Sequence, residues 1–214
     1  NHDLVTNQND KTLSLTDKKL SKSPFLSSGI GGILHIASSY SSRFNEVILQ
    51  LPKGRSLKGI NVSANRGQTT IINASLENAT LNTNSYILRI EGSRIKNSKF
   101  TTPNIINIFD TDLTDSQLES TKNHFHAENI RVYGKVELSS KNALSIMLTQ
   151  KESQEINLDL SSHHGPIYQL SRDESQRHPN ELSNPYKTEK TDAKGQLIAK
   201  SDDYISLETT ANRP

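Results

Sequence analysis

Two histidines and a glutamate in this 214-residue sequence have the residue types and spacing to hold a metal ion. His124, His126 and Glu128 alternate with other residues, so in a strand all three would share one face, where a metal could be held. The same histidines also suit buried or corner positions of an irregular coil. We therefore predict no bound metal and no cofactor.

Four carboxylates lie close together in the sequence and could act as acid and base on a sugar, as paired carboxylates do in glycosidases. They are Asp110, Asp112, Asp115 and Glu119. Exposed positions of a regular coil, balanced by partners such as Arg94, explain the same residues without catalysis. We predict that Asp110, Asp112 and Asp115 belong to a binding surface.

Basic residues are concentrated just before these carboxylates. Residues 51–102 contain eight Lys or Arg against two acidic residues, whereas residues 103–160 contain five against nine. Such a basic face could meet nucleic acid or anionic lipid, but no aromatic residues are interleaved with it. We predict a solvated binding surface and no nucleic-acid partner. The basic candidates for this surface are Arg89, Arg94, Lys96 and Lys99.

The composition limits the fold that can present these residues. Only 32% of the residues are hydrophobic, against about 45–50% apolar in an ordinary domain. Ser, Thr and Asn make up about 30% of the chain, and they compete with the helical backbone for hydrogen bonds. Cysteine is absent, which excludes disulfides and sulfur-based zinc sites. The sequence also lacks nucleotide-binding fingerprints and an apolar run long enough to cross a bilayer.

The central region contains pairs of apolar residues five apart, and the pairs recur with a period of roughly 18 to 19 positions. This period is typical of a β-solenoid, in which equivalent residues stack at the strand spacing of about 4.8 Å. The stacking predicts a column of alternating charge at Lys58, Glu77 and Lys96, with Arg94 over Asp112. The pairs are Leu57 and Val62, Leu76 and Leu81, Ile95 and Phe100, and Leu113 and Leu118. The series formed by the second member of each pair continues to Val136.

Tandem five-residue units at 74–83, 93–102 and 111–120 resemble degenerate pentapeptide repeats. The resemblance implies a right-handed β-helix, although coils with this period are shorter than four strict units. Similar β-helical regions occur in effectors that Gram-negative bacteria inject into host cells. The resemblance therefore also implies that the protein is secreted and binds a protein partner. In its most specific form, it implies secretion into a host cell.

We predict an all-β protein in three parts. Residues 1–25 are polar and mobile, and residues 26–160 form the solenoid with its caps. Within the upstream cap, residues 44–51 have both helical and strand periodicity, and we favour a strand. Residues 161–214 contain few apolar residues and are predicted to be a disordered tail. Open strand edges would also allow two copies to pair edge to edge.

Three tyrosines spaced 18 apart, Tyr168, Tyr186 and Tyr204, lie in the predicted tail. The segment around Tyr168, GPIYQL, resembles the EPIYA-type motif that host kinases phosphorylate in injected effectors. A phosphate would add about −1.5 to −2 charge that Arg-containing domains recognise. Alternatively, the spacing reflects worn coils in which the tyrosines are packing residues.

Taken together, these patterns predict a non-enzymatic interaction or scaffold protein. The alternatives are a carbohydrate-binding or carbohydrate-active β-helix that uses the 110–119 carboxylates, or a non-catalytic fragment of a larger effector enzyme. A DNA-mimicking protein would need a continuous acidic face, and the basic excess in residues 51–102 opposes it.

Overall fold

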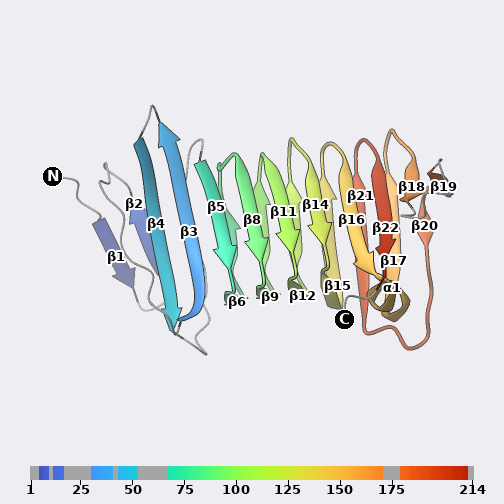
Figure 1. The fold of residues 1–214 in the computed structure, drawn as a ribbon, viewed down its shortest axis with the longest axis horizontal. Helices are drawn as coiled ribbons and strands as arrows, with labels where there is room; N and C mark the ends of the chain where they lie inside the picture. Colours follow the sequence, from blue (N-terminus) through green and yellow to red (C-terminus); the bar gives the residue numbers. More distant parts are fainter. Residues whose placement is uncertain are drawn as a thin grey trace.

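The computed structural model describes the backbone of residues 5–9, 12–16, 30–40, 43–52, 67–170 and 179–211, and the side chains from residue 68 onward within these ranges. Strands dominate the described chain, and they stack side by side along one long axis (Figure 1). The prediction of an all-β, solenoid-like fold is confirmed at this level. Among the described residues, no helix is long and apolar enough to cross a membrane.

Each regular rung contributes three strands, and equivalent strands of successive rungs pair in parallel. The first sheet contains β5 (Gly67–Ile72), β8 (Ile87–Glu91), β11 (Ile105–Phe109), β14 (Phe125–Glu128) and β16 (Leu144–Thr149). The second contains β6 (Ser75–Glu77), β9 (Arg94–Lys96), β12 (Asp112–Thr114) and the start of β15 (Arg131–Ser140). The third contains β7 (Thr80–Asn82), β10 (Lys99–Thr102), β13 (Gln117–Ser120) and the rest of β15.

An antiparallel hairpin precedes the regular rungs. Strand β3 (Ile30–Tyr40) pairs with both β4 (Arg43–Pro52) and β5, so residues 44–51 form a strand, as favoured. Of the segment predicted to be mobile, residues 5–9 and 12–16 form the paired strands β1 (Val5–Asn9) and β2 (Thr12–Thr16). Leu57, Lys58 and Val62 lie outside the described residues.

The core is the set of side chains that all three sheets point inward. Along the strands of the regular rungs, buried residues alternate with more exposed ones, and the predicted stacks form: Leu76 pairs with Ile95, which pairs with Leu113. One predicted stack is wrong. Leu118 pairs with Leu138 rather than Val136, because the chain accommodates one additional residue at the corner before Glu137.

Two corners of each rung depend on left-handed backbone conformations. The eight residues with φ between 45° and 61° in the described chain form two columns at these corners. Only Gly, Asn and Asp adopt this conformation readily. Their N–H groups donate to carbonyls one rung away, for example Asn78 to Lys96 (3.0 Å) and Asn97 to Thr114 (2.9 Å). The columns are Asn73, Gly92, Asp110 and Asn129, and Asn78, Asn97, Asp115 and Gly134.

Buried hydroxyls follow the corner residues and join the rungs. Ser98 Oγ accepts the Ala79 N–H at 3.0 Å and donates to Lys96 O at 2.6 Å. Ser116 Oγ accepts the Ser98 N–H at 3.2 Å one rung later. Because buried polar backbone groups must be paired, these hydroxyls satisfy groups that the strand ladders leave free. The high Ser and Thr content is explained in part by these positions.

The described residues of the far end form one helix and six strands. They are α1 (Gln150–Glu155), β17 (Ile156–Ser162), β18 (Ile167–Leu170), β19 (Asn180–Leu182), β20 (Tyr186–Lys187), β21 (Gly195–Ser201) and β22 (Ile205–Thr210). Strands β21 and β22 are inner strands of the third and first sheets, with Leu197 and Ala199 fully buried. The prediction of a disordered tail over 161–214 is therefore wrong for the strands in that range. Few apolar residues suffice there, because two residues per strand complete a rung of a core that other rungs already form.

Candidate functional site

The seven predicted binding residues are spread over the three sheets and two corners. Arg89 lies on the first sheet, and Lys99 lies on the third. Asp110 and Asp115 occupy left-handed corner positions. The remaining three, Arg94, Lys96 and Asp112, lie on the second sheet.

Ion pairs connect successive rungs across the second sheet. Lys96 Nζ lies 3.1 Å from Glu77 Oε1, and Arg94 Nε lies 3.4 Å from Asp112 Oδ2. Asp112 also contacts Arg131 of the next rung. These contacts confirm the predicted charge pairing between stacked positions. Because the pairs are partly exposed, each stabilises the fold by only about 0–1 kcal/mol.

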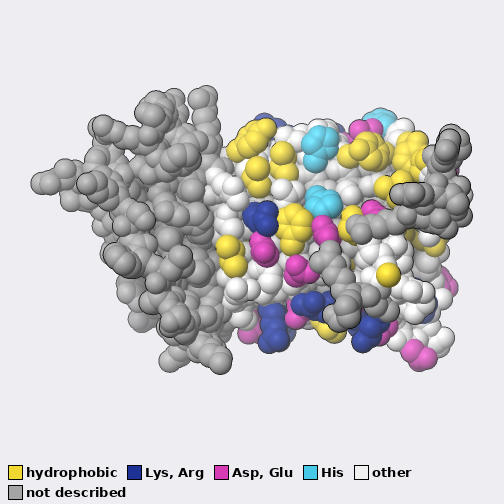
Figure 2. Space-filling view, in the orientation of Figure 1, with side chains coloured by type: hydrophobic (Ala, Val, Ile, Leu, Met, Phe, Trp, Pro, Cys, Tyr) yellow, Lys and Arg dark blue, Asp and Glu magenta, His cyan; other side chains and the backbone are white. Residues whose placement is uncertain are grey.

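The outer surface of the first sheet is chemically mixed, and Figure 2 shows charged, histidine and hydrophobic side chains interleaved on it. The Arg89 guanidinium lies 4.7 Å from the Phe109 ring centroid, and its Nη2 lies 2.7 Å from Glu91 Oε2. The Phe109 ring lies 5.6 Å from the ring of His126. Arg89 therefore already has structural partners.

The predicted histidine face is only partly assembled. His126 Nε2 lies 3.7 Å from Glu128 Oε2, and both side chains point outward from β14. The buried alternative is wrong, because Phe125 and Ala127 stack on Ile106 and Ile108 instead of the histidines. His124 is exposed in the preceding turn. Within the described residues, no three His, Asp or Glu side chains are grouped as metal ligands.

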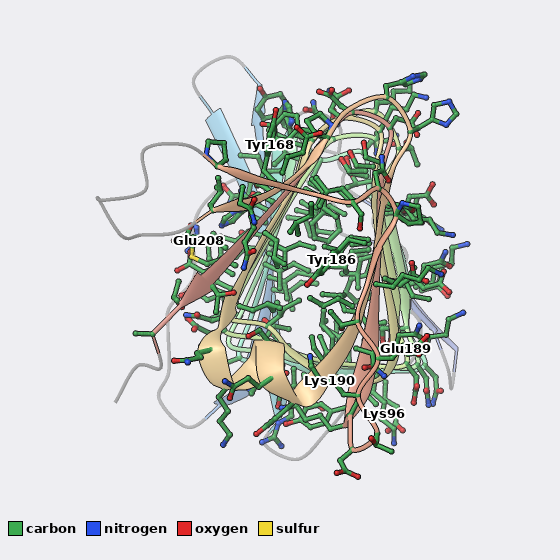
Figure 3. All side chains as sticks on the ribbon, turned by 90° about the vertical axis from the view of Figure 1, so that its right-hand side faces the viewer. Lys96, Tyr168, Tyr186, Glu189, Lys190 and Glu208 are labelled. Carbon is green, nitrogen blue, oxygen red and sulfur yellow. The ribbon has the colours of Figure 1, made fainter. Side chains whose placement is uncertain are left out.

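The three tyrosines occupy different environments at the far end, and Figure 3 labels two of them, Tyr168 and Tyr186. Tyr186 packs against the core, which is the structural role that the sequence left open. Tyr168 is half-buried in β18 between Glu181 and Ser206, and Tyr204 is 39% exposed in a turn. Phosphorylation of any of them stays a prediction.

The predicted carboxylate cluster does not converge on one cavity. Asp110 accepts a hydrogen bond from Asn129 Nδ2 at 3.1 Å and lines a hollow of about 420 Å³ with Tyr133 and Lys194. Asp115 lines a different groove, and Glu119 lines neither. Acid–base chemistry on one sugar needs two carboxyl groups facing a shared bond. Nothing in the described hollows places two of these four carboxylates in that way.

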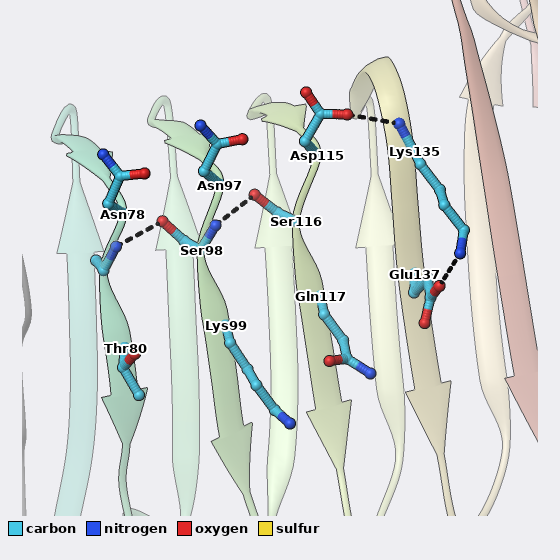
Figure 4. A pocket seen from close by; sticks show the side chains of 11 residues that line it. Asn78, Thr80, Asn97, Ser98, Lys99, Asp115, Ser116, Gln117, Lys135 and Glu137 are labelled. Atoms are coloured by element: carbon cyan, nitrogen blue, oxygen red, sulfur yellow. Dashed lines mark hydrogen bonds and ion pairs between the residues drawn. The ribbon is translucent and has the colours of Figure 1, made fainter.

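The second hollow is a polar groove, which we call the corner groove (Figure 4). It has a volume of about 550 Å³ and follows the corner between the second and third sheets. Its floor repeats with the rungs, because each of four rungs contributes one outward side chain of the third sheet, and three of these rungs also contribute a left-handed corner residue. The corner residues are Asn78, Asn97 and Asp115, and the outward side chains are Thr80, Lys99, Gln117 and Glu137.

The two lysines of the corner groove differ in whether they have an ion-pair partner. Asp115 Oδ1 accepts the backbone N–H of Lys135 at 2.9 Å, and Lys135 Nζ lies 2.6 Å from Glu137 Oε1. This contact lowers the pKa of Glu137 below its usual value, against a smaller opposing effect of burial. Lys99 is exposed, and no carboxylate of the described chain lies within ion-pair distance of it. The groove therefore presents a free cation among neutral amides and hydroxyls.

Of the seven predicted residues, the structure brings only Lys99 and Asp115 into this groove. The sequence did not lead us to predict Thr80, Gln117 and Glu137 as members of a site. A signal for them was available, because each directly precedes an inward residue of the repeat, Leu81, Leu118 and Leu138 respectively. Aligning the residues beside the apolar track, instead of the track alone, would have found the row.

The stacked parallel sheets define a β-solenoid-like protein with a polar groove at one corner. The family model of Toastrack DUF4097 matches residues 1–208, and the chain belongs to this family. Neither a curated protein nor a solved structure matches the chain. The comparisons give no support to the resemblance to pentapeptide repeats or to injected effectors.

Proposed function

We propose that this protein is a non-enzymatic binding scaffold that holds an extended acidic segment of a partner protein in the corner groove. The observation that carries the proposal is the row of Thr80, Lys99, Gln117 and Glu137, which repeats one position over four rungs with one unpaired cation. A solenoid holds such a row rigidly, so little conformational freedom of the scaffold is lost on binding.

The dimensions of the row favour a short peptide. Neighbouring strands lie about 4.8 Å apart, and an extended peptide advances about 3.3 Å per residue, so about five residues would span the four rungs. Amide and hydroxyl groups of the floor can hydrogen-bond a peptide backbone. An acidic side chain would pair with Lys99, and the Lys135–Glu137 pair would lie at one end.

Three more specific proposals rest on the sequence alone. The solenoid is a right-handed coil with the repeat period of the sequence, the protein is secreted, and it acts as a bacterial effector or as the targeting module of one. A carbohydrate ligand is the competing class, and the binding experiment below includes it.

The test measures binding of three probes to the full chain by titration calorimetry: a short Glu-rich peptide, its Lys-rich counterpart and an uncharged oligosaccharide. We expect the Glu-rich peptide to bind, and Lys99→Glu to weaken it at least about tenfold, equivalent to about 1.4 kcal/mol. Lys122→Glu is the matched control, because Lys122 is an exposed lysine that does not line the groove. Equal weakening by both variants, no peptide binding, or binding of the oligosaccharide instead would contradict the proposal.

A further inference from the structure

The strands at the far end are not stacked in chain order. In the third sheet β21 lies between β15 and β17, and in the first sheet β22 lies between β16 and β18 (Figure 1). Residues 195–210 thus form a rung between two rungs that both precede them in the chain. We call this rung the inserted rung, and we call the space that it fills the slot.

Both strands of the inserted rung are paired on both sides. In the third sheet, Leu138 pairs with Ala199, which pairs with Leu160. At the corner, Asp202 N–H donates to Ser140 O at 3.1 Å, and His164 N–H donates to Asp202 O at 2.9 Å. Strands β17 and β18 pair with β21 and β22 instead of with β15 and β16. The last rung is therefore joined to the regular rungs mainly through the inserted one.

The slot exists because α1 replaces a strand of the second sheet. Thr149 caps the helix by accepting the Glu152 N–H at 3.1 Å. Glu152 is buried, and its carboxylate accepts the Val132 N–H at 2.8 Å and pairs with Lys194 at 2.8 Å. The helix thus covers the open edge of the second sheet. After the helix, the chain rejoins the third sheet one layer too far along the axis, at β17.

The slot selects its occupant by shape. A Cβ atom on Gly195 would lie 2.8 Å from Val132 O and 3.1 Å from Gly134 O, and both are backbone atoms. Strand β17 has a similar inward pattern, but Ile156 stands at the position that pairs with Gly195. A side chain of that size cannot enter, so β17 cannot close the slot in this register. Within the described chain, the segment that begins at Gly195 is the one that the slot accepts.

We propose that residues 195–210 are a strand-exchange element, and that the slot of one copy accepts this segment from a second copy. In the exchanged state each slot regains the same register, the same buried Leu197 and Ala199, and the same corner bonds. The remaining cost is the association entropy and the change of direction in residues 188–194, so exchange is favoured by concentration. This connecting segment contacts α1 and β17 through Lys190 and Lys194.

The absence of cysteine allows a direct test on the full chain. Ser139 and Lys200 are register partners and point outward from β15 and β21. One batch carries Ser139→Cys and another carries Lys200→Cys, so neither copy can form this disulfide alone. The two batches are mixed at high concentration, warmed to the start of unfolding, cooled and oxidised. We expect a covalent heterodimer on a non-reducing gel.

The matched control replaces Ser139→Cys by Glu119→Cys. Glu119 pairs with Ser139 from the other side, so it lies two strand spacings, about 10 Å, from residue 200 in an exchanged dimer. That distance exceeds the roughly 7 Å limit for a disulfide. We expect several-fold less heterodimer from this mixture. Equal yields from the two mixtures would show random collision and overturn the proposal, as would no heterodimer in either.

A second measurement uses the double variant Ser139→Cys/Lys200→Cys, oxidised at low concentration so that the inserted rung is locked in its own slot. After the same warming and cooling, light scattering should show monomer for the locked variant and dimer for the same variant kept reduced. Dimer formation by the locked variant to the same extent would mean that the copies associate by another surface, and strand exchange would be wrong.

Discussion

In residues 67–128, strands β5 to β14 each pair with the strand one repeat later, whereas at the far end β15 and β16 pair with β21 and β22, which follow much later in the chain. Leu113 pairs with Val132 of the next repeat, but Leu138 pairs with Ala199, which lies far beyond the next repeat along the chain. Both regions bury the same inward pattern. The difference shows that the sequence repeat specifies which residues of a rung point inward. The order in which the rungs stack depends instead on particular residues such as Gly195 and Glu152.

Truncating one buried side chain in each region should separate their stabilities. Phe100→Ala should lower the free energy of unfolding by about 3–5 kcal/mol, because a fully buried ring is lost from the regular rungs. Leu197→Ala should cost about 2–5 kcal/mol, with the loss seen first as faster hydrogen exchange in residues 156–210. Urea unfolding followed by circular dichroism gives the first quantity, and mass-spectrometric hydrogen exchange gives the second.

The control for the ring is Phe109→Ala on the outer face of the first sheet. Its contact with Arg89 predicts a loss of only about 0.5–1 kcal/mol. If Leu197→Ala and Phe100→Ala accelerated exchange equally throughout residues 67–210, the two regions would unfold as one unit and the comparison would fail.

The edge of the second sheet gives the next largest effect. Glu152→Ala should destabilise the protein by about 1–3 kcal/mol, since it leaves the buried Val132 N–H without its acceptor. Glu155 also contacts Lys194 at 2.8 Å but is more exposed, so Glu155→Ala should destabilise the protein less than Glu152→Ala does. Thermal unfolding of both variants checks the difference. Equal losses would mean that Glu152 stabilises the protein through its ion pair with Lys194 and not through its hydrogen bond with the Val132 N–H at the sheet edge.

The regular region was largely predictable from the sequence. The spacing of Leu76, Ile95 and Leu113 predicts their stacking, and the charges beside them predict the pairs of Glu77 with Lys96 and of Arg94 with Asp112. Each of these contacts joins residues one repeat apart, so a period in the sequence contains the information.

The far end and the groove were harder to predict for a physical reason. Residues 195–210 have the composition of a polar segment, and their order results from neighbours that are distant in the chain, such as Leu138 and Leu160. A rung with two inward residues per strand carries little hydrophobic signal by itself. The corner groove was missed in part because its members are exposed polar residues, whose types vary from rung to rung even though their position is constant.

A smaller effect tests the left-handed corners of the regular region. Gly92 has φ of +58° in the column that also contains Asn73, Asp110 and Asn129. Gly92→Val should cost about 1–2 kcal/mol, because a β-branched residue is strained in this conformation, whereas Gly92→Asn should be close to neutral. The melting temperatures of the two variants and of the unmodified protein, measured in the same buffer, test this difference. A Gly92→Asn loss as large as that of Gly92→Val would show that space at the Asn73 side chain, and not backbone conformation, limits the position.

The smallest expected effect concerns pH and the corner of the inserted rung. The contact with Lys141 holds the pKa of Asp202 below its ordinary value, against a smaller effect of burial, and His163 and His164 lower it further. Because the folded pKa is lowered, this stabilisation is fully present above the ordinary pKa of Asp202 and is lost as pH falls through the folded value. Lys141→Met should therefore lower the melting temperature at pH 7, and its melting temperature should converge with that of the unmodified protein as the pH falls through the folded pKa of Asp202. Lys135→Met, which removes the comparable contact to Glu137 in β15, should follow the same pH trend. Only Lys141→Met should speed hydrogen exchange of the inserted rung, because Lys141 forms an ion pair with Asp202 of that rung, whereas Lys135 pairs with Glu137 of its own strand. A melting-temperature difference for Lys141→Met that stayed constant from pH 7 to pH 2 would show that the side chain stabilises this corner by packing and not by its charge.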